Sequence, residues 1–252
     1  MLEYATLEDD DENGENGGAS IVVHLHDVHF TWPGTPRFSL IAKDFVVYRG
    51  ERLLLLGPSG GGKSTLLSLL AGIVTPQTGS VSVLGTDITR LSLAARDKFR
   101  AEHCGIIFQM FNLLPYGTVI DNVLLPLSFS RRRRANVERQ SSPPSEAARL
   151  LARLGLSPDQ ITKHRASSLS VGQQQRVAAA RALIGRPELI IADEPTSALD
   201  RRHQAEFLKL LFDDASKAGS TLIMVSHDES LAEHFTRVVQ LEDIVKIERG
   251  QS

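Results

Sequence analysis

A glycine-rich segment near residue 60 has the spacing of a phosphate-binding loop. Gly57 and Gly62 are separated by four residues, and Lys63 and Ser64 follow directly. Glycines let backbone amides approach an anion, and a helix that begins at this point adds the positive end of its dipole. Lys63 would bring its ammonium to the terminal phosphates, and the Ser64 hydroxyl can bind Mg²⁺. The loop consists of Gly57, Pro58, Ser59, Gly60, Gly61, Gly62, Lys63, Ser64 and Thr65. The full pattern, more than a glycine-rich turn with a lysine, predicts a P-loop nucleoside triphosphatase.

A second candidate for chemistry is a pair of adjacent carboxylates, Asp193 and Glu194. The pair follows the apolar run 189–192, so we expect it at the end of a buried strand beside the strand that enters the phosphate loop. Asp193 can hold Mg²⁺ through its water shell, and Glu194 can act as a general base toward an attacking water. Alone, the pair is equally well explained as a surface acidic pair that opens a loop. Its position downstream of the phosphate loop favours the chemical interpretation.

Four further motifs follow in order along the chain. Gln109 comes after a strand-like run, and residues 169–176 read Leu-Ser-Val-Gly-Gln-Gln-Gln-Arg. Residues 197–200 read Ser-Ala-Leu-Asp, and His227 comes after the apolar run 221–225. In this order they resemble the Q-loop, the signature, the D-loop and the switch histidine of the ABC (ATP-binding cassette) ATPases. The resemblance extends from about residue 21 to residue 241.

This resemblance implies ATP and Mg²⁺ as cofactors and a homodimer that forms head to tail on ATP binding. Each phosphate loop would then face the signature of the other copy, so that nucleotide lies between Lys63 of one and Ser170 of the other. The implied catalytic residues are Glu194, His227, Lys63 and Gln109. The implied metal ligands are Ser64, Gln109 and Asp193. Outside the phosphate loop, the implied nucleotide-binding residues are Trp32, Ser170, Gly172, Gln173 and Asp200.

Two positions depart from the family pattern. Val171 stands where the signature usually has a small residue, which is tolerated if only the neighbouring amides bind phosphate. Trp32 stands where the family usually has an aromatic residue, often tyrosine, that stacks on adenine, and an indole keeps that stacking face. Phe30 is the alternative, because it lies two residues earlier on the same face of the predicted strand.

The elements that must position these residues follow an α/β pattern. Short apolar runs predict buried strands, and they occur at 52–56, 105–108, 189–192 and 221–225. Helices are expected at 63–71, 173–184 and 202–217. This alternation predicts a right-handed, doubly wound core. The resemblance adds an N-terminal antiparallel β subdomain and an inserted α-helical subdomain. The ATPase domain would span 20–252, after a disordered acidic tail at 1–19.

The inserted α-helical subdomain is expected at about 110–166, where five prolines interrupt the parallel-sheet pattern. Its first part, residues 110–127, resembles the helical lobe of ATPases that serve exporters of the macrolide-export and lipoprotein-release kind. That resemblance implies a separate integral membrane permease that docks on this lobe. The same apolar side chains also suit the core of the lobe, and we expect most of them to serve both purposes.

Two clusters of like residues stand outside these motifs. The run Arg131 to Arg134 is expected to be a solvated loop, and the alternative is contact with anionic lipid headgroups. His24, His26 and His29 share a predicted strand, on which His24 and His26 lie on one face. No carboxylate or cysteine stands near them at ligand spacing, so the sequence does not favour a metal site there.

Composition limits the classes of protein to which the chain can belong and the compartment that suits it. A formal net charge of −2 and a pI near 6.5 argue against a dedicated nucleic-acid binder. One cysteine, Cys104, suits a reducing compartment. The sequence shows neither a secretory segment nor an apolar run long enough to cross a bilayer. We therefore expect a cytoplasmic protein, peripheral on the cytoplasmic face of the membrane, that contacts the membrane only through its partner.

Two hypotheses follow for the whole chain. The first is the motor of an ABC transporter, in which ATP binding closes the homodimer, hydrolysis reopens it, and the permease exports or extracts a substrate. The second is a soluble ABC ATPase of an assembly or repair complex, for example of the iron–sulfur cluster assembly type, without a membrane subunit. A regulatory cassette that does not hydrolyse ATP is disfavoured by the intact Lys63, Glu194 and His227.

Overall fold

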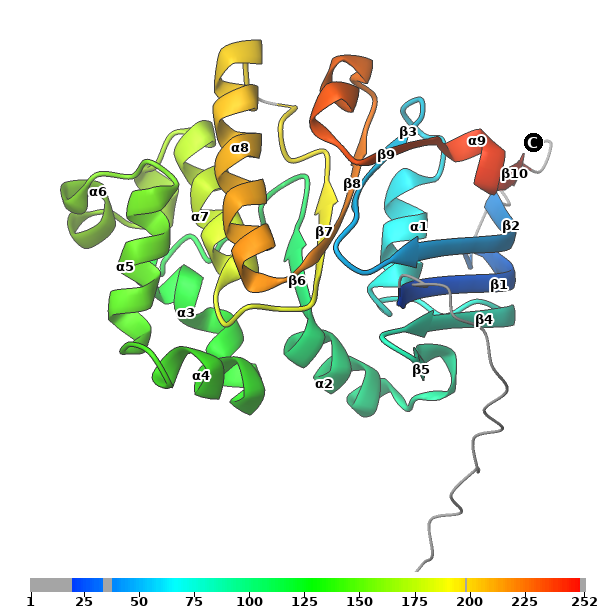
Figure 1. Cartoon of the computed structure of the whole chain (residues 1–252), viewed down its shortest axis with the longest axis horizontal. Helices are drawn as coiled ribbons and strands as arrows, with labels where there is room; N and C mark the ends of the chain where they lie inside the picture. Colours follow the sequence, from blue (N-terminus) through cyan, green and yellow to red (C-terminus); the bar gives the residue numbers. More distant parts are fainter. Residues whose placement is uncertain (1–19, 34–37, 198, 250–252) are drawn as a thin grey trace, which may run out of the picture.

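The computed structural model of the chain describes residues 20–33, 38–197 and 199–249. The tail predicted at 1–19 lies outside these residues. Figure 1 shows a helical region on the left, a parallel sheet in the middle and an antiparallel sheet on the right. Within the described ranges, no helix combines the length and apolar character that a bilayer crossing requires.

The antiparallel sheet has the strand order β10-β2-β1-β4-β5. Its strands are β1 (Ile21–Thr31), β2 (Phe38–Tyr48), β4 (Thr78–Val83), β5 (Thr86–Asp87) and β10 (Lys246–Arg249). Along β1, the buried Val23 and Leu25 alternate with the more exposed His24 and His26, as in a strand with one face on the core. A bulge at Asp27, whose φ is +46°, then shifts the pairing with β4.

The parallel sheet has the strand order β6-β7-β8-β3-β9. Its strands are β3 (Arg52–Leu56), β6 (Cys104–Ile107), β7 (Leu189–Asp193), β8 (Thr221–Ser226) and β9 (Arg237–Gln240). β3, β7 and β8 are almost wholly buried, because this sheet is covered on both faces. The predicted neighbourhood of β7 and β3 is wrong, since β8 lies between them and pairs with both.

Helices cover this sheet and connect its strands. They are α1 (Lys63–Leu70), α2 (Leu93–His103), α7 (Val171–Leu183), α8 (Arg201–Ala218) and α9 (Leu241–Ile244). Short 3₁₀ turns lie at η1 (Ile88–Arg90), η2 (Ala166–Ser168) and η3 (Glu229–His234). α7 begins two residues before the predicted start at 173, because Ser170 caps it and admits Val171 and Gly172 to its first turn.

A group of helices stands on the far side of the parallel sheet from the antiparallel sheet (Figure 1). These are α3 (Val119–Phe129), α4 (Arg131–Glu138), α5 (Pro143–Arg153) and α6 (Pro158–Lys163). α3 and α5 both pack against α7. One buried apolar cluster contains Leu54 and Ile107 of the parallel sheet together with Val123 of α3 and Leu151 of α5. The helical group therefore shares its core with the strands that position the site.

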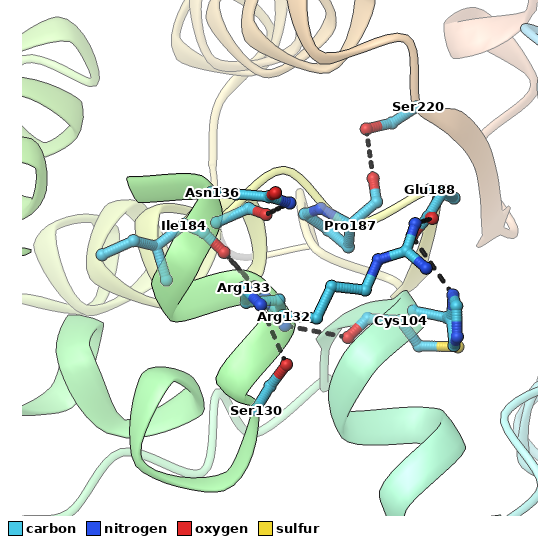
Figure 2. Close-up of polar contacts among 11 residues, drawn as sticks. Cys104, Ser130, Arg132, Arg133, Asn136, Ile184, Pro187, Glu188 and Ser220 are labelled. Atoms are coloured by element: carbon cyan, nitrogen blue, oxygen red, sulfur yellow. Dashed lines mark hydrogen bonds and ion pairs between the residues drawn. The ribbon is translucent and has the colours of Figure 1, made fainter. Parts of the chain in front are cut away.

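The arginine run differs from the predicted solvated loop. Residues 131–134 form the first turn of α4, which Ser130 caps, and the Arg133 side chain is 2% exposed. Its guanidinium donates hydrogen bonds to four carbonyl oxygens from β6 and the end of α7, and Figure 2 shows those to Ile184 and Cys104. The four oxygens belong to Ile184 (2.8 Å), Cys104 (3.1 Å), Ala182 (2.9 Å) and Arg181 (3.3 Å). Arg132 forms an ion pair with Glu188. Because Arg133 is buried and Arg132 is paired, the run is not a wholly solvated segment.

Arg133 closes the end of a helix from inside the protein. The last carbonyls of a helix have no partner within it and carry the negative end of its dipole, so a cation that donates several hydrogen bonds there is favourable. Burial lowers the pKa of Arg133 to about 10, which leaves the guanidinium charged at neutral pH. The side chain therefore fastens α4 to α7 and β6 at one point.

We expect Arg133→Met to lower the free energy of unfolding by about 3 kcal/mol, because buried carbonyls lose a charged donor. Urea unfolding followed by circular dichroism measures this change. Arg131→Met is the matched control, since Arg131 is exposed on the same helix, and its effect should stay within about 0.5 kcal/mol. Equal stability of the two variants would contradict the structural role of Arg133.

Candidate nucleotide-binding site

The phosphate loop lies between the end of β3 at Leu56 and the start of α1 at Lys63. Gly60 and Gly62 have φ values of +74° and +91°, in the left-handed region that glycine adopts most easily. A Cβ at Gly62 would also lie 2.8 Å from the Ile247 side chain. Gly62 caps α1 without any side chain, and the first turn of α1 has no acidic residue. No side chain at this helix start therefore competes with an anion for the backbone amides.

Lys63 is buried beneath this loop. Its Nζ donates to the carbonyl oxygens of Gly57 at 2.8 Å and Pro58 at 3.1 Å, and it lies 3.0 Å from Oε1 of Glu194. A buried ammonium needs such partners, because desolvation would otherwise disfavour its charge. The ion pair connects the phosphate loop directly to the carboxylates at the end of β7.

The carboxylate pair lies where β7 ends, as predicted from the sequence. The Ser64 hydroxyl is hydrogen-bonded to Asp193, while burial raises the pKa of Asp193, an effect that this hydrogen bond opposes. Glu194 follows with φ at +43°, a conformation that is costly for a side chain with a Cβ. Nδ1 of His227, directly after β8, lies 3.0 Å from Oε2 of Glu194. Lys63, Glu194 and His227 therefore form a continuous chain of contacts.

Lys63 and Glu194 border a cavity of about 380 Å³, whereas His227 reaches it only through its contact with Glu194. Its lining consists of Trp32, Phe38, Ser59, Gly60, Gly62, Lys63, Ser64, Thr65, Gln109 and Glu194. Trp32 is 41% exposed, and its indole N–H donates to Thr65 Oγ1 at 3.1 Å. Phe30 is 3% exposed and meets the Trp32 ring edge-on, with 5.1 Å between ring centroids. Trp32 thus borders the cavity, whereas Phe30 lies in the core and packs against the Trp32 ring.

Gln109 reaches the cavity from a loop with unusual backbone geometry. The loop follows β6, and Phe111 and Asn112 have φ values of +58° and +47°. Arg181 of α7 donates to the carbonyl oxygens of both residues, with 2.7 Å to that of Asn112. Burial lowers the pKa of Arg181. This arginine therefore holds the loop that presents Gln109.

The signature residues lie elsewhere, at the start of α7. Ser170 and Gln173 form a capping box, in which Gln173 N–H donates to Ser170 Oγ at 3.4 Å and Ser170 N–H donates to Gln173 Oε1 at 2.8 Å. Val171 is exposed beside them, and Gly172 has room around its Cα. None of Ser170, Gly172 and Gln173 borders the cavity of the same chain.

Asp200 also stands apart from the cavity. It caps α8, where its carboxylate accepts a hydrogen bond from the backbone N–H of His203 at 3.1 Å and contacts His203 Nδ1 at 2.7 Å. The backbone hydrogen bond, followed by the ring contact, lowers the pKa of Asp200. Ala198, part of the predicted D-loop, lies outside the described residues. The structure thus separates the predicted residues into a cavity group and a group at two exposed helix starts.

Three residues near the cavity were missed by the sequence analysis. Phe38 lines the cavity but belongs to no recognisable motif. Arg249 of β10 donates a hydrogen bond to the Gly60 carbonyl oxygen at 2.8 Å. Arg181 could have been suspected, because it is a charged residue in the alanine-rich run 177–184 that predicts a buried helix. Phe38 and Arg249 carry no such signal, since only strand pairing brings β2 and β10 to the phosphate loop.

Comparison with known proteins agrees with this geometry. The profile of the ABC transporter family matches residues 42–197. The chain belongs to the ABC transporter family and is an ATPase of that family, with its α/β P-loop fold, as predicted.

Two individual relatives are similar to this chain over most of its length. The ABC transporter ATP-binding protein YbbA of Escherichia coli (strain K12) is 43% identical over 204 residues, which cover 80% of this chain and 85% of YbbA. The macrolide export ATP-binding/permease protein MacB of Bradyrhizobium diazoefficiens is 43% identical over 195 residues, 77% of this chain and 28% of MacB. The resemblance to macrolide-export ATPases is thereby confirmed.

Among solved structures, the dimeric bacterial ABC transporter cassette MJ0796 matches with a TM-score of 0.77 and 32% identity, over 91% of this chain and 99% of that one. A dimeric post-hydrolysis state of MJ0796 bound to ADP and Pi matches with a TM-score of 0.76 and 33% identity, over the same shares of the two chains.

Proposed function

We propose that two copies of this chain bind ATP head to tail, so that each nucleotide lies between the cavity of one copy and the start of α7 of the other. The observation that carries this proposal is the separation of two anion-binding features in one chain. The cavity contains the phosphate loop, whereas Ser170 caps an exposed helix start outside it. The dimeric form of the similar cassette MJ0796 supports pairing of two copies.

The cavity residues, together with His227 beside Glu194, suit in-line attack of water on the terminal phosphate. Glu194 accepts the proton of the water, and His227 orients Glu194 and contacts the γ-phosphate. Lys63 exchanges its contact with Glu194 for the phosphates and spreads their charge, and Trp32 stacks on the base. Asp200 bridges the two copies. Gln109 senses the nucleotide and passes its state to the loop that Arg181 holds.

The donor set near Ser64 fits Mg²⁺. Asp193 is a carboxylate whose charged form is disfavoured by burial, and Ser64 and Gln109 add neutral oxygens. Hard oxygen donors of this kind, together with phosphate oxygens and water, are what Mg²⁺ prefers. When bound, Mg²⁺ neutralises charge on the phosphates. Asp193, Ser64 and Gln109 are the residues that would hold it.

Glu194→Gln tests the proposed chemistry and the dimer together. The amide keeps the shape of the side chain but cannot accept the proton, so we expect ATP turnover to fall by about 100-fold or more. With MgATP the variant should elute as a dimer in size-exclusion chromatography coupled to light scattering, and without nucleotide as a monomer.

Adding Ser170→Arg to Glu194→Gln provides the control. An arginine at the start of α7 blocks the facing surface but leaves the cavity unchanged, so the double variant should stay monomeric with MgATP. Parental turnover in Glu194→Gln, or a monomer in saturating MgATP, would contradict the proposal.

We further propose that the chain powers export or membrane extraction through a separate permease at the cytoplasmic face of the membrane. A groove of about 570 Å³ lies between α2 and α3, and Ala101, Leu125, Pro126 and the 68% exposed Phe129 contribute to its lining. Phe108 and Asn112, on either side of Gln109, border the same groove. An apolar segment of a permease seated there would touch the loop that presents Gln109.

The names of the relatives support the transport part of this proposal. YbbA is named as an ATP-binding protein of an ABC transporter, and MacB as an ATP-binding/permease protein for macrolide export. The aligned part of MacB is 28% of its length, so this chain matches only a portion of that protein. A separate permease subunit would supply the function that the rest of such a protein provides.

We expect Phe129→Asp to move the chain from the membrane fraction to the soluble fraction, because a carboxylate cannot be buried in an apolar contact. Quantitative immunoblotting of fractions from the source cells measures this, and basal ATPase activity should be unchanged. Ile21→Asp is the control, as Ile21 is an exposed apolar residue on the antiparallel sheet. If the parental chain is found only in the soluble fraction, the soluble assembly-type ATPase becomes the better account.

A further inference from the structure

Two histidines and an aspartate meet on the outer face of the antiparallel sheet, away from the nucleotide cavity. His24 and His26 project from the same side of β1, because the buried Leu25 between them faces the core. Asp44 of β2 is directly opposite His26 in the strand pairing. Asp44 Oδ1 lies 2.7 Å from His24 Nε2 and 3.9 Å from His26 Nδ1. Local sequence spacing does not reveal Asp44, because this carboxylate is brought in by pairing with another strand.

We propose that His24, His26 and Asp44 bind a divalent transition metal ion of the Zn²⁺ type. One ligand atom from each residue lies within 4.8 Å of the other two. In a tetrahedral zinc site with bonds of about 2.0–2.1 Å, ligand atoms lie about 3.3 Å apart. The three side chains are exposed enough to close this difference by rotating about their own bonds. Water would complete the coordination.

The surroundings of His26 supply the outer contact that such sites use. With Nδ1 directed at the metal, Nε2 faces the carboxylate of Asp27, whose Oδ2 is 3.6 Å away. A metal-bound histidine usually donates its other ring N–H to a carboxylate, which fixes the ring and strengthens the metal bond. Asp44 and Asp27 together also balance the two positive charges of the ion.

The β-bulge at Asp27 is what places this second carboxylate. Its positive φ turns the backbone toward β4, where Gly79 leaves the space that a Cβ would fill against the Asp27 carbonyl. Bulges that redirect a side chain in this way are common next to functional sites. Without the bulge, Asp27 would alternate to the core face, since it follows His26 directly.

The ligand types select among metals. Imidazole nitrogens favour Zn²⁺, Ni²⁺ and Cu²⁺, whereas Mg²⁺ prefers a shell of oxygens. The site therefore differs in chemistry from the oxygen donors at Ser64 and Asp193. Within the part of the chain that the structure describes, no other three histidine, cysteine or acidic side chains are grouped closely enough to hold an ion.

Calorimetric titration of the EDTA-treated full chain with ZnCl₂, in millimolar MgCl₂ and without nucleotide, tests this inference. We expect His24→Ala and His26→Ala each to weaken Zn²⁺ binding by about 10- to 100-fold or more, and Asp27→Asn by about tenfold. His29→Ala is the matched control, because His29 is exposed on the same strand but outside the cluster. Two-residue contacts elsewhere, such as His203 with Asp200, stay intact in every variant.

Thermal unfolding gives an independent reading. A ligand that binds only the folded chain raises Tm, so Zn²⁺ should stabilise the parental chain and His29→Ala but not His26→Ala. Zn²⁺ affinity that is the same in the parental chain, His24→Ala and His26→Ala would overturn the proposal. Failure of the parental chain to bind Zn²⁺ at 100-fold excess over protein, or complete displacement by Mg²⁺, would overturn it as well.

Discussion

The contact between Lys63 and Glu194 is the interaction on which the site depends. It brings a buried ammonium from the start of α1 within 3.0 Å of a buried carboxylate from the end of β7. Each charge would be costly without the other, because both have lost most of their water. His227 extends the pair from the end of β8. Since β3, β7 and β8 run parallel, their carboxyl ends deliver all three residues to one edge of the sheet.

Two buried arginines connect the elements near this edge of the sheet to the helical region. Arg181 holds the carbonyls of Phe111 and Asn112 in the loop after Gln109, and Arg133 holds the carbonyls at the end of α7 and the start of β6. Ser170 caps the start of α7, so one helix connects the signature, the Gln109 loop and α4. Hydrogen bonds from charged side chains therefore connect the groove between α2 and α3 to the loop that presents Gln109.

Local sequence patterns predicted the positions of the phosphate loop and the carboxylate pair. The phosphate loop and the carboxylate pair are each defined by adjacent residues, and the buried strands that precede them are continuous apolar runs, so short windows contain the necessary information. The sequence did not predict that β8 separates β7 from β3, because strand order is set by long-range pairing. The same limit hid Asp44, which is 18 residues from His26 and reaches it only by register.

The prediction for the arginine run was wrong, and the choice between the two aromatic residues was left open, for a different reason. Four identical residues show no hydrophobic periodicity, so nothing marked Arg133 as the one that turns toward buried carbonyls. Phe30 and Trp32 lie on one face by strand alternation, and only packing shows that Phe30 is covered while Trp32 borders the cavity. In both cases the groups that surround a side chain in the folded protein, rather than its residue type, decide whether it is buried or exposed.

Mixing two inactive variants is the most direct test of a site shared between copies. Lys63→Ala removes the cavity function and Ser170→Arg removes the facing function, so each alone should hydrolyse ATP poorly. A mixed dimer of the two keeps one complete site, formed by Lys63 of one copy and Ser170 of the other. The account predicts that a one-to-one mixture regains a substantial part of the parental turnover. No recovery on mixing, or full turnover by Ser170→Arg alone, would contradict it.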